Sequence, residues 1–195
     1  TADKARIVVQ EMIDGISLEL VEKRLVTDQL VLTVGYDIEN LTRPEIRKVY
    51  KGPVTTDRYG RRVPKHAHGT WNLPRATSSS SELLEAMAAL YDKIVNPALL
   101  IRRMSLSACH VVNEKMAKER EQKETFEQLD LFTDYAKKEA KEKEEQKKRE
   151  RERRMQEALL TIKKKYGKNA VLRGMNFEEG ATAKERNGQI GGHQA

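Results

Sequence analysis

The chain has little that would cross-link it, anchor it in a membrane or bury it as a whole. Cys109 is its single cysteine, which excludes an intramolecular disulfide and agrees with a reducing cytoplasm. No apolar run is long enough to cross a bilayer, and no signal peptide is recognisable. Because 38% of the residues are hydrophobic and 34% are charged, we expect a compact domain with a solvated extension instead of one core spanning the chain.

Patterns that would indicate catalysis or a cofactor are missing as well. His66, His68 and the Cys109–His110 pair have no CxxC partner, so a zinc site is not expected. Cys109 has no base and orienting group at a recognisable spacing. The glycines near residue 190 lack the strand-to-helix context of a phosphate-binding loop. We therefore expect no enzyme activity, no bound metal and no cofactor in this chain.

Positive charge is what the chain has in excess. Lys and Arg number 37 against 30 Asp and Glu, a formal net charge of +7, which favours polyanionic partners. Nucleic acid is the first candidate and an acidic membrane surface the second. The sequence opens on Thr1 without an initiator Met and enters a helical pattern at once, so we expect a fragment of a longer protein.

Hydrophobic periodicity predicts an α+β domain over residues 1–113. Apolar residues at spacings of three and four predict helices over 3–26 and 80–95, the second with Ser79 and Glu82 in capping-box positions. Alternation predicts strands over 29–37, 66–73 and 101–112. We expect an antiparallel sheet with both helices on one face and an open, polar, basic second face. The Gly- and Pro-rich segment 40–65 is expected to be a loop or ragged hairpin that turns at 57–60.

The composition changes abruptly after residue 113. We interpret 114–127 as a linker, 133–166 as a solvated charged helix supported by opposite charges three and four residues apart, and 167–195 as an irregular, Gly-rich polar tail. Apolar heptads are absent, which disfavours a coiled coil. The sequence leaves open whether the charged helix is a stiff spacer or adds nonspecific attraction to DNA.

The sharpest motif is the pentapeptide Gln128-Leu129-Asp130-Leu131-Phe132. Leu131 and Phe132 offer adjacent apolar anchors, Leu129 offers a third, and Gln128 has an amide that can bond the rim of a pocket. The motif resembles the short peptides that dock into a hydrophobic pocket of the bacterial sliding clamp. A charged neighbourhood suits such a linear motif. The alternative is that these are core residues of the following helix, against which the polar flanks argue.

Three segments of the domain carry a family resemblance: 31–37 (VLTVGYD), 68–74 (HGTWNLP) and 102–107 (RRMSLS). On these segments, residues 30–112 resemble the little-finger domain of Y-family, UmuC-like lesion-bypass DNA polymerases. The tail segments 174–182 (GMNFEEGAT) and 186–193 (RNGQIGGH) resemble the C-terminus of such polymerases from Gram-positive bacteria. Domain, clamp peptide and tail also occur in the family's order.

The resemblance implies a DNA-holding role. A little finger grips the primer-template duplex beside the active site, largely through phosphate contacts from its sheet. It normally begins with a strand before the first helix, and here that strand is missing or truncated. The palm carboxylates that bind two metal ions for nucleotidyl transfer are absent, so this chain should not polymerise, whereas the parent enzyme would use Mg²⁺.

The residues that we expect to contact DNA are basic or carry small polar groups suited to phosphate oxygens. They are Thr70, Asn72 and Arg75 around the second strand, Arg58, Arg61, Arg62 and Lys65 in the basic loop, and Arg102, Arg103, Ser105 and Ser107 in the last strand. The alternative for the loop residues is that they are ordinary solvated charges. Trp71 is expected in the core. Base readout is not expected, because a bypass enzyme must tolerate many templates.

Together these features predict a cytoplasmic, nucleoid-associated, nonenzymatic fragment of a translesion polymerase that serves DNA repair and SOS-type damage tolerance. Its expected partners are duplex primer-template DNA and the sliding clamp, with no membrane contact. The weak contact with the duplex and the weak contact with the clamp would reinforce each other, because each raises the effective concentration for the other. The alternative is a stand-alone basic module that binds RNA or a protein assembly. The oligomeric state and the role of the tail are left open.

Overall fold

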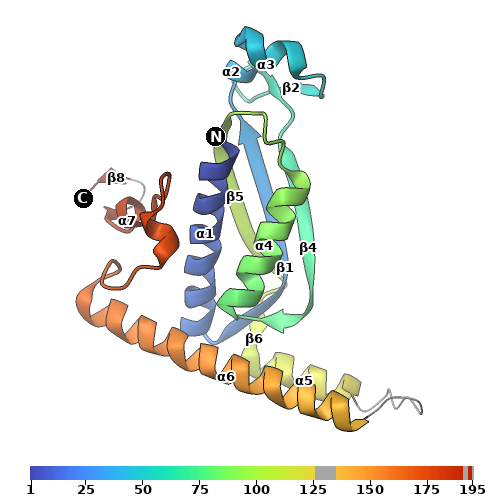
Figure 1. The fold of residues 1–195 in the computed structure, drawn as a ribbon, viewed down its shortest axis with the longest axis vertical. Helices are drawn as coiled ribbons and strands as arrows, with labels where there is room; N and C mark the ends of the chain where they lie inside the picture. Colours follow the sequence, from blue (N-terminus) through green and yellow to red (C-terminus); the bar gives the residue numbers. More distant parts are fainter. Residues whose placement is uncertain (126–134, 191–192, 195) are drawn as a thin grey trace.

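The computed structural model describes residues 1–125, 135–190 and 193–194. Helices α1 (Ala2–Glu22) and α4 (Ser80–Ile94) cover one face of an antiparallel sheet (Figure 1). The sheet consists of β1 (Leu25–Tyr36), β4 (Ala67–Thr77) and β5 (Ile101–Cys109) in the order β4-β1-β5, with the short β6 (Val112–Asn113) paired to the start of β1. The predicted α+β class is confirmed.

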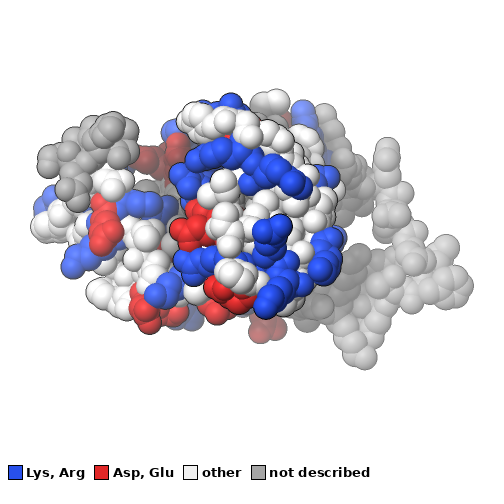
Figure 2. Space-filling view, turned by 90° about the horizontal axis from the view of Figure 1, so that it is seen from above, with Lys and Arg blue, Asp and Glu red and all other residues white. Residues whose placement is uncertain are grey.

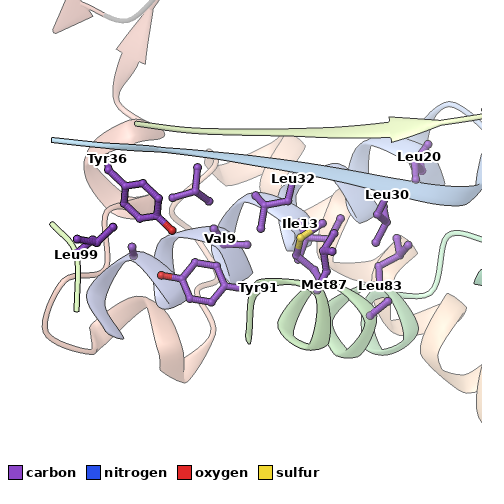
Figure 3. Close-up of a cluster of buried hydrophobic side chains, with 14 residues drawn as sticks. Val9, Ile13, Leu20, Leu30, Leu32, Tyr36, Leu83, Met87, Tyr91 and Leu99 are labelled. Atoms are coloured by element: carbon purple, nitrogen blue, oxygen red, sulfur yellow. The ribbon is translucent and has the colours of Figure 1, made fainter. Parts of the chain in front are cut away.

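The core lies between the sheet and these two helices. Leu30, Leu32 and Val34 alternate along β1 and are fully buried on its helix side. Figure 3 shows Leu30 and Leu32 facing side chains such as Ile13 of α1 and Met87 of α4, which are also fully buried. Burying one such side chain stabilises the fold by about 1.5–3 kcal/mol, so the alternation of β1 fixes which face meets the helices.

The first helix ends earlier and the first strand begins earlier than the periodicity predicts. Arg24 has a φ of 56°, a left-handed conformation that ends α1 and turns the chain into the sheet. Leu25 and Val26 then pair with β6 instead of continuing the helix. His110 has a φ of 51° and divides the predicted 101–112 strand into β5 and β6. Tertiary pairing has therefore overridden the local pattern at both places.

The start of α4 was predicted correctly. The Ser79 hydroxyl accepts a hydrogen bond from the Glu82 N–H at 3.2 Å, although the Glu82 carboxylate pairs with Arg75 of β4 instead of completing the box. Close packing of α4 on β4 depends on Gly69, where an added Cβ would lie 2.8 Å from Ile94 Cγ2. Trp71 is half-buried and packs against the core, as expected.

Residues 39–65 form a small substructure at one end of the sheet, which we call the basic tip (top of Figure 1). It contains α2 (Glu39–Thr42), α3 (Pro44–Val49), β2 (Val54–Thr56) and β3 (Arg62–Pro64). The predicted turn at 57–60 is present, since the Gly60 N–H donates to the Asp57 carbonyl at 3.0 Å and Gly60 has a φ of 77°. The two short helices were not predicted. Pro44 at the first turn of α3 is typical of a helix start, but each helix is too short to show periodicity.

The C-terminal part is mostly helical. Helix α5 (Glu114–Thr125) occupies most of the segment that we interpreted as a linker. The long α6 (Tyr135–Tyr166) covers most of the predicted charged helix. After it come η1 (Gly174–Phe177), α7 (Ala183–Arg186) and the strands β7 (Gln189–Ile190) and β8 (His193–Gln194). Among the described helices, none is both long and apolar enough to cross a membrane.

Helix α6 is docked on the domain, whereas the sequence predicted a solvated helix. Gln156 is only 2% exposed, and its amide donates to the Ser78 carbonyl at 3.0 Å and to the Ser80 hydroxyl at 2.9 Å. One turn earlier, the Glu152 carboxylate accepts hydrogen bonds from the Ser79 and Ser81 hydroxyls and from the Ser81 N–H. The four serines at the start of α4, Ser78 to Ser81, thus form the surface on which α6 docks.

The tail folds back onto α1, although an irregular tail was expected. The side chain of Glu11 is 0% exposed and accepts hydrogen bonds from Asn176 Nδ2 at 2.9 Å, the Thr182 N–H at 2.9 Å and Arg186 Nη2 at 3.1 Å. One turn further along α1, Asp14 lies 2.8 Å from Arg173 Nη2. We call this set of bonds to Glu11 and Asp14 the tail contact; it covers the surface of α1 that faces away from the sheet.

Candidate nucleic-acid interface

The sheet face opposite α1 and α4 presents side chains in cross-strand rows, which we call the open face. The strand register aligns the rows Asn72–Gln29–Cys109, Thr70–Val31–Ser107 and His68–Thr33–Ser105, with Arg103 beyond the last. Two cross-strand bonds order these side chains: Gln29 Nε2 donates to Asn72 Oδ1 at 2.9 Å, and Thr33 Oγ1 lies 2.9 Å from His68 Nδ1. The open face is therefore a largely polar surface with pre-positioned hydroxyl and amide groups.

Positive charge on the open face is confined to one end. Arg103 is its one Lys or Arg; this side chain is exposed and forms no ion pair with another described residue. Gly35, its partner in the register, presents no side chain beside it. The sequence predicted an open, polar and basic face, and in the structure its positive charge lies only where the sheet meets the basic tip.

Two of the predicted DNA contacts on the strands, Arg75 and Arg102, pair with carboxylates. Arg75 is half-buried and pairs with Glu82 on the helix side of β4. Arg102 sits at an irregularity of the register, since Gly35 pairs with Arg103 and Tyr36 with Ile101. The bulge directs Arg102 to Asp37, whose Oδ2 lies 3.4 Å from Arg102 Nη1. Thr70, Asn72, Ser105 and Ser107, by contrast, share the open face.

The basic tip concentrates the charge that the open face lacks. Residues 39–65 contain eight Lys or Arg against three Asp or Glu, and Figure 2, which looks onto this end of the molecule, shows Lys and Arg side chains around its surface. Glu39 pairs with Arg43, and Asp57 pairs with Arg61. Arg62 and Lys65 are exposed and form no ion pair with a described residue. The tip therefore keeps an excess of positive charge.

The β2–β3 turn gathers Arg58 and Arg61 around an aromatic ring. Asp57 Oδ1 accepts hydrogen bonds from the Tyr59 and Arg61 N–H groups at 2.9 and 3.0 Å. The hydrogen bond from the Arg61 guanidinium, with these backbone bonds, lowers the pKa of Asp57, so its carboxylate stays ionised and holds the turn. The guanidinium carbons of Arg58 and Arg61 lie 4.7 and 5.0 Å from the centroid of the Tyr59 ring. We did not predict Tyr59 as a site residue, although an aromatic between cations in a Gly turn was visible in the sequence.

A hollow of about 500 Å³ lies between α5, α6 and residues 75–79. Its walls carry both signs of charge, and some of these charges pair within the wall: Glu114 lies 3.1 Å from Arg153 Nη2 through Oε2 and 3.1 Å from Lys118 Nζ through Oε1. Glu152, also in the wall, bonds Ser79 and Ser81. The hollow lies where several elements meet, and its lining carries no large excess of one charge that would attract a ligand.

The clamp peptide, Gln128 to Phe132, lies outside the described residues. Within the described ranges, no three His, Cys, Asp or Glu side chains are grouped so that they could hold a metal ion. Among the described residues, the predicted site residues other than Arg75 and Arg102 lie in the open face and the adjoining basic tip. Comparisons of the chain with family models, with curated proteins and with solved structures gave no match.

Proposed function

We propose that this chain holds duplex DNA against its open face and basic tip, as the DNA-gripping and clamp-tethering part of a lesion-bypass DNA polymerase. The observation that carries the proposal is the arrangement of an uncovered, largely polar sheet face that leads into a tip with excess positive charge. Much of the hydrogen bonding in protein–DNA complexes goes to phosphate and sugar, from Ser, Thr, Asn and Gln side chains as well as from Arg and Lys. Such contacts hold a duplex without reading its sequence.

The spacing of the rows supports backbone contact. Rows on one face of a strand are two residues apart, or about 7 Å, so the three rows span about 14 Å. This length corresponds to about four base-pair steps along the axis of B-DNA. Arg103 and the tip cations at one end would add the electrostatic part of the affinity, which depends on salt.

The clamp peptide completes the proposal as a tether. Its anchors Leu131 and Phe132 would bind the sliding clamp weakly, and the tethered domain would then meet DNA at a high effective concentration. The tether is tested separately from DNA binding, by calorimetric titration of the chain into a sliding clamp. Binding that is lost in a Leu131→Ala/Phe132→Ala variant supports it, and no binding by the parent chain contradicts it.

DNA binding is tested by fluorescence anisotropy with a labelled blunt duplex at several salt concentrations. The Arg103→Ala/Ser105→Ala variant should bind several-fold more weakly, and the slope of log affinity against log salt should fall by about 1 because one phosphate contact is lost. Lys23→Ala is the matched control, because Lys23 is an exposed cation at the end of α1, outside the open face. If the double variant keeps the affinity and salt slope of the parent chain, the open face does not contact DNA.

A further inference from the structure

Tyr59 is held outward by a turn with a fixed geometry. Its side chain lies at the end of the basic tip and is 65% exposed, whereas Tyr50, in the same substructure, packs against the core and donates its hydroxyl to the Pro53 carbonyl. Asp57 and Gly60 fix the backbone on either side of the ring. A large ring exposed to water gives up the stabilisation that burial would bring, and most of its surface is left accessible to a ligand.

The surroundings of the ring are positively charged. The guanidinium groups of Arg58 and Arg61 lie over the ring at cation–π distance. Arg61 is balanced by Asp57, whereas Arg58 donates a hydrogen bond to the Tyr59 hydroxyl and forms no ion pair with a described residue. Arg62 and Lys65 add exposed charge on the adjoining strand. A base can take the place of one of these exposed guanidinium groups on the ring, and the displaced cation can then pair with the phosphate of the same nucleotide.

We infer that Tyr59 is a stacking platform for an unpaired base, and that the basic tip binds single-stranded nucleic acid. Inside a duplex each base face is covered by its neighbours, so a side-chain ring can stack only on an unpaired or terminal base. The inference rests on the proposed function: the open face leads into the tip, so a strand that continues beyond a duplex on that face would reach Tyr59. The open face would thus bind the double-stranded part of a nucleic acid, and the tip would bind its single-stranded part.

The experiment measures anisotropy with a labelled single-stranded oligonucleotide and with a blunt duplex. Tyr59→Ala should weaken single-strand binding about fivefold or more, the effect of removing one stacked base, with little change for the duplex. Tyr59→Phe keeps the ring and should keep the affinity. Tyr166→Ala is the matched control, because Tyr166 is 67% exposed with Lys165 5.2 Å from its ring, but lies on α6.

Each remaining outcome contradicts the inference in a recognisable way. Equal single-strand binding by Tyr59→Ala and the parent chain would show that the ring does not stack. An equal loss with the duplex would make Tyr59 a duplex contact. Duplex binding that depends on Arg103 and Ser105 while the tip variants have no effect would leave the proposed function standing without the platform. If no nucleic acid binds the parent chain, the proposed function fails with it.

Discussion

Glu11 is a carboxylate enclosed between α1 and the tail. Burial opposes its ionisation, but hydrogen bonds from Asn176 and from the N–H groups of Thr182 and Ala183, together with the charge of Arg186, outweigh burial and lower the pKa of Glu11. Nothing local predicts this role, because in the sequence Glu11 is one polar residue in a mixed helical pattern. Its partners lie 165 to 175 residues away, and the periodicity of α1 carries no information about them.

Glu11→Gln should destabilise the folded chain by about 1.5–3 kcal/mol at neutral pH, the contribution of hydrogen bonds to a charged group. Urea denaturation of the parent chain and the variant measures this difference. Glu19→Gln is the control on the same helix, because the Glu19–Lys23 pair is exposed and contributes about 0–1 kcal/mol. Equal effects of the two substitutions would show that the tail contact does not form as described.

The difference in stability between the parent chain and Glu11→Gln should depend on pH. Because the pKa of Glu11 is lowered by folding, its contribution to stability is complete above the pKa of the unfolded chain and is lost as the pH falls through the folded value. The advantage of the parent chain over Glu11→Gln should therefore shrink below about pH 4. Burial raises the pKa of Asp14, against the opposing charges of Arg173 and Lys163. The contribution of Asp14 to stability therefore changes with pH in the opposite direction. The difference between the two proteins isolates Glu11.

At the scale of elements, patterns of polarity predicted faces better than ends. Alternation identified the buried side of β1 and the polar side of β5, because both strands have one face toward the helices. It could not predict that β6 would pair with Leu25 and Val26, nor that a bulge would turn Arg102 toward Asp37. Strand ends and bulges are set by partners elsewhere in the chain, which a local pattern does not contain.

The docking of helix α6 could not be predicted from a local pattern either. Its composition predicted a helix, but the docked face is largely polar. Among its described side chains, the most buried is the amide of Gln156. A hydrophobic pattern cannot reveal an interface made of Gln156, Glu152 and a row of serines. The apolar residues that return near Leu159 were the one visible sign that α6 stops being fully solvated there.

Gln156→Ala should lower the stability of the chain by about 1–3 kcal/mol, since the Ser78 carbonyl and the Ser80 hydroxyl each lose a donor in a buried site. Thermal unfolding measures the loss, and hydrogen exchange should show faster exchange in α6. The control is Gln146→Ala, because Gln146 is exposed on the same helix and its amide donates to Glu150, one turn away on that helix. Unchanged exchange in α6 would contradict the docking.

At the scale of the whole molecule, α1 is a middle layer between the sheet and the tail. The sequence predicted the sheet and its two helices, and it placed Thr70, Asn72, Ser105 and Ser107 on one surface because alternation holds along β4 and β5. It did not predict that the tail would complete the other side of α1. The candidate interface was therefore predictable where strands alternate, and the tip only as a basic loop.

Removing residues 167–195 should lower the melting temperature, because it uncovers Glu11 and Asp14. The informative measurement is a cycle of four proteins: the parent chain, Glu11→Gln, the truncated chain, and both changes together. In the truncated chain Glu11→Gln should have almost no further effect, since its partners are already gone. Additive losses would mean that Glu11 stabilises the chain through something other than the tail.

The long sequence separation within the tail contact also sets an order of assembly during translation. The sheet and its two covering helices need only residues up to 113, while Arg186 follows 73 residues later in the sequence. At about 5–20 residues per second, a ribosome takes about 4–15 s to synthesise that stretch. The hydrophobic core can therefore form while Glu11 is still hydrated. The charge of Glu11 is dehydrated last, against a helix that the core already holds in place.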